Sequence, residues 1–513
     1  MFLRGSQRGF PLHRQLSPIR GLVDLDAGKE VSDKGEPFMG MHPELWRWTA
    51  TELAKGIRTR AISAREATES CLARIEQVNP VLNALVEVAA DDALASADAA
   101  DEAVAKGRKL GALHGVPVSI KINSDQAGHA TTHGTVSRKN NIVAHDAPHV
   151  ANLRKGGAIF VGRSNSPAFG YRWFTNCTAH GSTLNPWSRE HTPGGSSGGA
   201  GASVASGMVP IGHGNDIGGS IRYPAYACGV AGLRPTVGRI PSWYGDEDQS
   251  LSVQTMLAQG PLARSVADLK LALQAMSGFD ARDPLYAPVP LQGAAADRPI
   301  RVGIVRDGGV KQPVIEVDAA IDAAAAQLRD AGYGVEEVDG SIFAEAHRLW
   351  HLLVLEEFRP MMPAVREDGD PAMLKAAEYY YAHAETIWGA APSLETYMTG
   401  YARRGTLIAR LAQLMERWPL LLQPVSAELP FEQDADLASM QRMGEILEAQ
   451  WPMITLPVLG FPAVAVPTGL AQGLPVGVQI IGQRFREDMV LDAAEVIEAR
   501  SGTFTPIDPK FDQ

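Results

Sequence analysis

Two serines in glycine-rich loops and one lysine at the end of an apolar run are the residues of this chain whose types and spacing could do chemistry together. Ser196 lies in the run GGSSGG, Ser220 ends the run DIGGS, and Lys121 ends the run GVPVSIK. Serine is a weak nucleophile until a base removes its proton. Because burial lowers the pKa of a lysine, by up to about 3–5 units when it is complete, the apolar neighbours of Lys121 favour a neutral lysine that could be this base. We therefore interpret the three residues as a proton relay that makes Ser220 a nucleophile.

Each part of this interpretation has a simpler alternative. A GGSSGG run alone is most often a flexible linker or a turn-rich loop, and it can also cradle a phosphate. The chain has no G-x-x-x-x-G-K-[ST] motif, and the Ala- and Val-rich segment Ala200–Val209 that follows the loop is expected to be buried, which argues against a P-loop and against a linker. A lysine at a strand end is usually a surface residue. The sequence contains no G-x-S-x-G, H-E-x-x-H or paired-cysteine motif, but His133 and His213 leave a Ser–His pair open.

The segments around these residues alternate between strand-like and helix-like patterns. Thr49–Glu52 and Ser63–Glu66 fit capping boxes at helix starts, and the second helix is expected to stop at Pro80. Alternation at this short spacing predicts an α/β fold whose sheet carries helices on both faces. The expected strands are 116–122, 158–162, 300–305, 334–338, 420–423, 463–467 and 475–481, and the expected further helices are 89–106, 146–155, 316–331 and 487–498.

Residues 341–418 are helical and aromatic in pattern. Helix packing explains most of these aromatic side chains, and the functional interpretation is a wall over a substrate pocket that sets specificity. The aromatic residues are Phe343, Trp350, Phe358, Tyr379, Tyr380, Tyr381, Trp388 and Tyr397.

Composition excludes several classes of protein. The chain has 513 residues, 45% of them hydrophobic, which is ample for a large core. Its formal net charge of −11 argues against a nucleic-acid binder, which needs a basic face. The three cysteines, Cys71, Cys177 and Cys228, are far apart, which predicts a reducing, cytoplasmic location without a disulfide framework or a zinc site. The apolar stretch Met453–Leu470 contains three prolines, so we expect no membrane span.

Residues 1–40 differ from the rest of the chain. Four arginines precede the first acidic residue, Asp24. A basic, acid-poor start can be a transit peptide, but it has no apolar segment of a secretory signal. We expect a disordered N-terminal extension over 1–40, with Met39 or Met41 as an alternative start.

Several motifs in order carry a resemblance to a known family. The chain resembles the amidase signature family of serine hydrolases, densely from Val116 to Pro235 and more loosely to about Glu498. The motifs that carry it are GVPVSIK (Gly115–Lys121), GRSNSPAFG (Gly162–Gly170), NPWSREHTPGGSSGG (Asn185–Gly199), GNDIGGSIRYPA (Gly214–Ala225), GLRPT (Gly232–Thr236), GPLARSVADL (Gly260–Leu269) and GLPVGVQIIG (Gly473–Gly482). The resemblance implies a large mixed, mostly parallel central β-sheet covered by helices on both faces. It also implies one amidase domain over 41–505, with a core at 110–240 and a variable helical pocket region at 341–450.

The resemblance also implies roles for single residues. Ser220 would attack an amide carbonyl, Ser196, which follows a cis peptide bond in this family, would pass the proton, and Lys121 would be the base. The oxyanion hole would consist of the backbone N–H groups of Ile217, Gly218, Gly219 and Ser220. From their positions beside these loops, we also expect Ser197 to support the loop through its hydroxyl, and Asp216 and Arg222 to pair or hydrogen-bond to hold the Ser220 loop. The family often has an acid directly after the lysine; here Ile122 and Asn123 follow it, and Asp125 is the nearest acid that could replace it in part.

Three functions are compatible with the sequence. The favoured one is a metal-independent, cofactor-free amidase for small aryl or alkyl amides, with esters or carbamates as further substrates. The second is a glutamyl-tRNA amidotransferase-type subunit, which would need partner subunits, and the third is a catalytically silent scaffold. The expected partner is a small-molecule amide, without nucleic acid, and homodimerisation is an expectation drawn from related enzymes only.

Overall fold

The structure is a computed structural model that describes residues 42–245, 248–295 and 299–511. The extension expected at residues 1–40 lies outside the described residues. The described residues form one compact unit.

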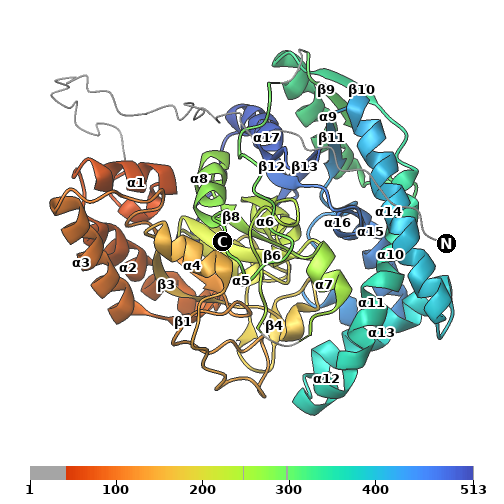
Figure 1. Cartoon of the computed structure of the whole chain (residues 1–513), viewed down its shortest axis with the longest axis horizontal. Coiled ribbons are helices and arrows are strands. Elements are labelled where there is room, and N and C mark those ends of the chain that lie inside the picture. Colours follow the sequence, from red (N-terminus) through yellow and green to blue (C-terminus); the bar gives the residue numbers. More distant parts are fainter. Residues whose placement is uncertain (1–41, 246–247, 296–298, 512–513) are drawn as a thin grey trace, which may run out of the picture. The chain divides into compact units, whose positions relative to one another are not determined.

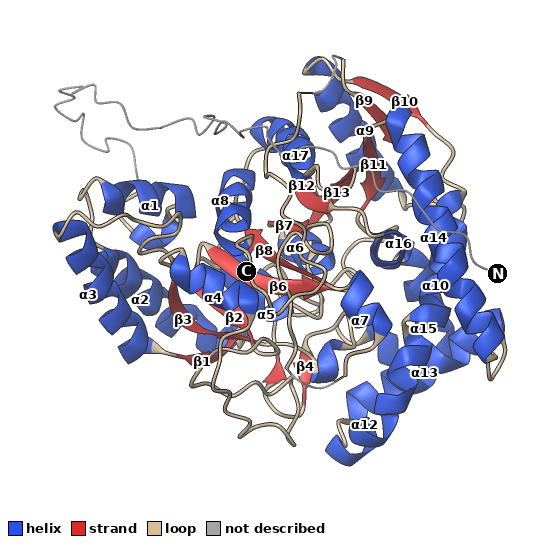
Figure 2. Cartoon of the chain, viewed as in Figure 1, coloured by secondary structure: helices blue, strands red, loops and turns tan. Residues whose placement is uncertain are grey.

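A sheet of eleven strands runs through the described part of the chain (Figure 2). Its strand order is β1-β3-β2-β6-β8-β7-β12-β13-β11-β9-β10, and β4 and β5 form a separate two-stranded ribbon. The strands are β1 (Leu85–Val88), β2 (Pro117–Lys121), β3 (Ile159–Ser164), β4 (Asn176–Cys177), β5 (Gly181–Ser182), β6 (Ile211–Asp216), β7 (Ala231–Arg234), β8 (Ala258–Ala263), β9 (Arg301–Ile304), β10 (Gly334–Glu337), β11 (Leu420–Pro424), β12 (Ala463–Ala471) and β13 (Leu474–Gly482).

Helices cover both faces of this sheet, as the alternating pattern predicts. They are α1 (Ala50–Arg58), α2 (Ala64–Leu82), α3 (Ala90–Ala105), α4 (Pro148–Lys155), α5 (Gly198–Ala205), α6 (Arg222–Cys228), α7 (Leu251–Met256), α8 (Val266–Met276), α9 (Ile315–Asp330), α10 (Ile342–Leu353), α11 (Leu355–Phe358), α12 (Met362–Asp368), α13 (Pro371–Trp388), α14 (Leu394–Arg417), α15 (Met440–Ala449), α16 (Trp451–Leu459) and α17 (Glu487–Ser501). Helices α5 and α6 contact each other and the central strands. Helix α17 contacts α8 and α9, α8 packs on β8, and α17 and α9 pack on β12 and β13. Within the described residues, none of the helices has the length and apolar composition needed to cross a membrane.

The sheet is mixed, and its parallel pairs lie in its outer parts. Strand β2 pairs in parallel with β3 and β6, and β9 pairs in parallel with β10 and β11. The central neighbours from β6 to β11 are antiparallel, so the expected parallel pairing does not extend to the centre. One reason is local: only Gln472 and Gly473 separate β12 from β13, and two residues can join strands only as an antiparallel hairpin.

The helix starts follow the sequence signals, whereas one helix end does not. Thr49 and Ser63 both form complete capping boxes with a glutamate three residues later. The helix expected to stop at Pro80 continues to Leu82 and ends at Asn83 in the left-handed conformation. Proline fixes a φ that a helix tolerates, and its cost is a lost N–H bond to the carbonyl four residues earlier. Pro80 and the residue that carries this carbonyl, Glu76, are both exposed, so water can bind the freed oxygen.

Strand β2 and its neighbours place the residues of interest at one edge of the sheet. All residues of β2 and β6 are buried, and Ser119 of β2 lies opposite Gly212 of β6. Because the two strands are parallel, their carboxyl ends, which carry Lys121 and Asp216, meet at the same edge. Helix α5, which follows the first serine loop, packs against β2, β3 and β6.

The segment 341–418 forms the helices α10 to α14, as its pattern predicts. Figure 1 shows α10, α13 and α14 together on the opposite side of the described unit from α1, α2 and α3. Helix α10 packs against α16, α14 and α13.

Candidate active site

Lys121 is fully buried and contacts the first serine loop directly. Its Nζ lies 2.7 Å from Oγ of Ser196 and 2.8 Å from Oδ1 of Asn215. The side chain has no solvent exposure. Burial lowers the pKa of Lys121 to about 7, against the opposing effect of the Asp216 carboxylate. A lysine in this state is neutral in a large fraction of molecules at neutral pH.

The Ser196 loop is held closely against the rest of the chain. The Gly195–Ser196 peptide bond is cis, as the resemblance implies. A Cβ on Gly195 would lie 2.4 Å from the carbonyl oxygen of Arg172, so only glycine fits there. The Ser196 side chain is almost fully buried, and its hydroxyl faces Lys121.

The Ser220 loop offers backbone donors, with one correction to the expected set. Gly219 has a φ of +96° and donates its N–H to Oδ1 of Asp216 at 2.8 Å, so this group is already bonded. Within the described residues, the N–H groups of Ile217, Gly218 and Ser220 donate to no acceptor. Three of the four expected donors are therefore available to a ligand.

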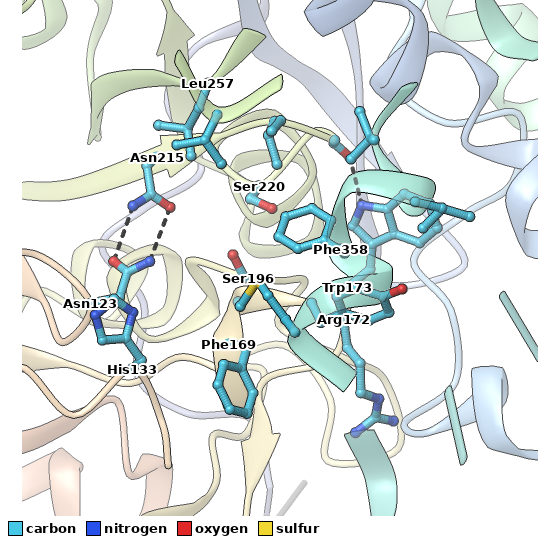
Figure 3. A pocket seen from close by; sticks show the side chains of 18 of the residues that line it. Asn123, His133, Phe169, Arg172, Trp173, Ser196, Asn215, Ser220, Leu257 and Phe358 are labelled. Carbon is cyan, nitrogen blue, oxygen red and sulfur yellow. Dashed lines mark hydrogen bonds between the residues drawn. The ribbon is translucent and has the colours of Figure 1, made fainter. Parts of the chain in front are cut away.

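The two serine loops are joined through their backbones. The N–H of Ser197 donates to the carbonyl oxygen of Ser220 at 3.2 Å. The Ser197 hydroxyl is buried without a hydrogen-bond partner among the described residues, so its expected supporting role falls to the backbone instead. The Ser196 and Ser220 hydroxyls both point into the same cavity in Figure 3, and no hydrogen bond joins them in the described part of the chain.

Two tryptophans from distant segments bind the carbonyl groups of the Ser220 loop. Nε1 of Trp350, on α10, donates to the Ile217 carbonyl at 3.0 Å. Nε1 of Trp173 donates to the Gly218 carbonyl at 2.7 Å. These two bonds fix the Ile217–Gly218 and Gly218–Gly219 peptide planes and so the directions of the Gly218 and Gly219 N–H groups. The sequence carries no local signal for either contact.

Asp216 and Arg222 form the pair that the sequence analysis predicts. Nε and Nη2 of Arg222 donate to the two carboxylate oxygens of Asp216 at 2.9 and 3.0 Å. The carboxylate also accepts the N–H groups of Gly219 and Ile221, which fixes the loop on both sides of Ser220. Arg222 further donates to the carbonyl groups of Pro452 and Met453, at the start of α16.

A cavity of about 170 Å³ opens above the two serines. One part of its wall is aromatic and aliphatic, and the other carries amide, hydroxyl and imidazole groups. Tyr171 meets Phe358 and Tyr380 edge to face, with ring centroids 5.7 and 5.2 Å apart. Of the aromatic residues expected to form a pocket wall, Trp350, Phe358 and Tyr380 line the cavity. The lining includes Asn123, His133, Phe169, Tyr171, Trp173, Ser196, Asn215, Ser220, Tyr244, Leu257, Trp350, Phe358 and Tyr380.

Asn215 is a site residue that the sequence analysis missed, and it is paired with Asn123. Nδ2 of Asn215 donates to Oδ1 of Asn123 at 3.0 Å, and Nδ2 of Asn123 lies 3.5 Å from Oδ1 of Asn215 (Figure 3). The parallel pairing of β2 with β6 is the signal that could have placed Asn215 beside Lys121. Asp125, which was expected to replace the missing acid in part, makes no hydrogen bond to Lys121 in the described structure.

The histidines do not form the Ser–His pair that the sequence left open. Nε2 of His213 hydrogen-bonds Oε1 of Gln259, and the ring stacks on His149. His133 lines the cavity, and burial lowers its pKa to about 4, so its ring is neutral at pH 7. Within the described residues, no group of three or more His, Cys, Asp or Glu side chains is arranged to hold a metal ion.

The fold and the buried contact between Lys121 and Ser196 are those expected of a serine hydrolase with a lysine base. A model of the amidase family matches residues 66–491, so the chain belongs to the amidase family. It is an amidase, and it cleaves the C–N bond of carboxylic amides.

Three relatives show which members of the family this chain is similar to. The chain is 41% identical over 465 residues to the indoleacetamide hydrolase of Bradyrhizobium diazoefficiens, covering 89% of this chain and 87% of that one. It is 35% identical to a glutamyl-tRNA(Gln) amidotransferase subunit of Synechococcus sp. strain WH7803, covering 88% and 96%. Its fold is similar to the crystal structure of a bacterial aryl acylamidase of the amidase signature family, with a TM-score of 0.78 and 29% identity over 91% of this chain and 98% of that one.

Proposed function

We propose that this amidase hydrolyses amides with an aromatic acyl group, of the arylacetamide type, through an acyl-enzyme on Ser220. The observation that carries the proposal is the contact between Lys121 and Ser196, buried beside the Ser220 loop at the floor of an aromatic-lined cavity. Lys121 is the base, Ser196 the proton carrier and Ser220 the nucleophile. Esters and carbamates with the same acyl group present the same carbonyl and are included.

In the first half-reaction, Oγ of Ser220 bonds to the carbonyl carbon. Its proton passes to the Ser196 hydroxyl, which gives its own proton to the lone pair of Lys121. The N–H groups of Ile217, Gly218 and Ser220 bind the negative oxygen that forms, which is the largest single source of stabilisation in such reactions. The C–N bond then breaks, and the leaving nitrogen keeps the electron pair and takes the proton back through Ser196.

In the second half-reaction, water replaces the amine. Its oxygen attacks the acyl carbon while its proton follows the same path to Lys121, and the Ser220 oxygen leaves with that proton. A serine suits the middle position because one hydroxyl both donates and accepts. Hydrogen bonds between catalytic groups often tighten only when the substrate binds, which accounts for the missing bond between the hydroxyls of Ser196 and Ser220.

The aromatic wall supports an aromatic acyl group. Phe169, Tyr171, Trp173, Phe358 and Tyr380 all line the cavity. Aromatic rings bury large apolar areas and favour edge-to-face neighbours, so a planar aryl group gains most in such a wall. A relative 41% identical to this chain is named an indoleacetamide hydrolase, which points to the same class of substrate.

The direct test is covalent labelling with a fluorophosphonate, followed by mass spectrometry of the intact protein. We expect one adduct on the wild type, mapped to Ser220, and none on Ser220→Ala or Lys121→Ala. An adduct that persists in Ser220→Ala would identify another nucleophile and overturn the assignment. The alternative function, an amidotransferase-type subunit, is tested in parallel by incubating the purified single chain with phenylacetamide. Hydrolysis in the absence of any partner protein would argue against this alternative.

The activity should depend on pH through Lys121. The base must be deprotonated to act, and burial lowers the pKa of Lys121 to about 7. We therefore expect kcat/KM to rise about tenfold per pH unit below that pKa and to level off above it. Initial rates measured between pH 5 and pH 10 give this rising part of the profile, the acid limb of kcat/KM. A limb centred near 4 would instead point to His133, whose pKa burial lowers to about 4.

A further inference from the structure

The nitrogen of Lys121 has two hydrogen-bond partners, and only one of them belongs to the serine relay. The other is Oδ1 of Asn215, at 2.8 Å. An amide oxygen only accepts hydrogen bonds, so Lys121 must use one of its own hydrogens there. A neutral amine has two hydrogens and one lone pair. With one hydrogen fixed on Asn215, the lone pair can face Ser196, whose hydroxyl then donates to it across 2.7 Å.

Asn123 pairs with the Asn215 amide in the orientation that presents Oδ1 of Asn215 to the lysine. Nδ2 of Asn215 donates to Oδ1 of Asn123 at 3.0 Å, and Nδ2 of Asn123 lies 3.5 Å from Oδ1 of Asn215, so the two amides are paired (Figure 3). A flipped Asn215 amide would place an N–H group against the Lys121 amine and would oppose two carbonyl oxygens at Asn123. Asn215 is 5% exposed, so water does not replace these partners readily.

The other charged or titratable groups near Lys121 are already paired or neutral, so a charge added at Asn215 would act on Lys121 directly. The Asp216 carboxylate acts on Lys121, but its two oxygens are bonded to Arg222. His133 and His213 face the lysine from two other elements, and burial lowers the pKa of both rings, which are therefore neutral at pH 7. Arg163 contacts Lys121 through the lysine's backbone carbonyl, at 3.5 Å, and also donates to the carbonyl groups of Ile122 and Ser124.

We propose that Asn215, held by Asn123, is a positioning residue that directs the lone pair of neutral Lys121 toward Ser196 without adding negative charge beside it. This inference rests on the proposed function, because it takes Lys121 as the base. An uncharged acceptor orients the amine and leaves it unprotonated. A carboxylate at the same distance would orient it equally well and would hold a proton on it.

Asn215→Asp tests the proposal, because the substitution keeps the acceptor and adds the charge. An opposite charge within about 4–6 Å favours the charged form of a group by about 1–3 pKa units. The acid limb of kcat/KM is therefore expected to move by about 1–3 pH units to higher pH. Activity at pH 7 should fall by about fivefold for a shift of one unit and by about five-hundredfold for a shift of three, and it should recover toward the wild-type value near pH 10. A role in packing alone would lower the rate without moving the limb.

Gln259→Glu is the matched control, since it also replaces a buried amide by an acid. Both partners of Gln259, Nε2 of His213 and the hydroxyl of Tyr244, can donate to a carboxylate, so the local contacts survive. Gln259 makes no hydrogen bond to Lys121 in the described structure. We expect its limb to move by at least one pH unit less than that of Asn215→Asp. Equal shifts would mean that any nearby charge suffices and would overturn the specific role of Asn215.

Asn215→Leu separates this inference from the proposed function. Leucine removes the acceptor without adding charge, so kcat should fall at every pH while fluorophosphonate still labels Ser220 slowly. An unmoved limb in Asn215→Asp beside a normal wild-type limb would overturn the inference alone. A wild type without a limb near neutral pH, or an active Lys121→Ala, would overturn the proposed function itself. Circular dichroism shows whether Asn215→Asp folds. If it does not fold, the inference is still tested by Asn215→Leu, because an unchanged kcat of that folded variant would overturn it.

Discussion

Replacing Lys121 with alanine is expected to lower kcat for an arylacetamide by a factor on the order of 10⁴–10⁶. The substitution removes the proposed base beside Ser196, and among the described residues no other group of comparable basicity hydrogen-bonds the Ser196 hydroxyl. Ser220→Ala should lose a similar factor, and the double variant should be no worse than Ser220→Ala, because residues of one relay act as a unit. Steady-state rates at pH 8, above the lowered pKa of Lys121, measure all three.

A lysine outside the site provides the control for this prediction. Lys270 pairs with Asp492 and Glu495 on the surface of the sheet's helical cover. Lys270→Ala makes the same truncation and should keep kcat within about twofold, since exposed ion pairs contribute little. A Lys121→Ala variant that keeps more than about a hundredth of the wild-type kcat would assign the base to another group.

The elements that carry the site were predictable because their signals are local. The apolar run before Lys121, the capping boxes at Thr49 and Ser63 and the alternation of strands and helices all act within a few residues of chain. The orientation of the central strands was not predictable from the same signals. Whether β7 and β8 run parallel or antiparallel depends on pairing between distant segments, and a buried strand looks the same in both cases.

The candidate site also has residues that local motifs identify and residues that only contacts between distant segments reveal. Ser196, Ser220 and Lys121 stand in motifs that can be read directly, and Asp216 and Arg222 are six residues apart in one of them. Asn215 lies inside the same motif, but its partner Lys121 is 94 residues away, and only the pairing of β2 with β6 brings them together. Trp350 binds the Ser220 loop across 133 residues of chain.

The correction at Gly219 has a physical cause that residue types alone do not show. A glycine-rich loop supplies free N–H groups in principle, and the sequence does not distinguish among them. In the structure the Asp216 carboxylate lies beneath the loop and binds the N–H of Gly219, because a buried charge needs several donors. The loop therefore gives one donor to its own support, while the N–H groups of Ile217, Gly218 and Ser220 have no acceptor within the described residues.

The largest effect on stability is expected at Arg222. Its guanidinium is fully buried and donates to both oxygens of Asp216, to the Pro452 and Met453 carbonyl groups and to Gln479. Arg222→Met fills a similar volume and leaves Asp216 with Arg234, whose Nε lies 3.6 Å away, as the remaining cation in contact among the described residues. Removing one partner of a buried pair costs about 3–5 kcal/mol. The free energy of unfolding in urea should fall by that amount.

Two further variants show whether the charge or the shape of Arg222 is responsible. Arg222→Lys keeps the charge but not the paired geometry, so it should lose part of the stability and part of kcat, and full retention of both would contradict the supporting role. Arg306→Met is the control, because Arg306 pairs with three partly exposed carboxylates and should cost no more than about 1 kcal/mol. Combining Arg222→Met with Asp216→Asn removes the buried carboxylate that has lost its main partner, so the double variant should recover part of the loss in stability. Its kcat should stay low, because the Ser220 loop then lacks the carboxylate that binds Gly219 and Ile221.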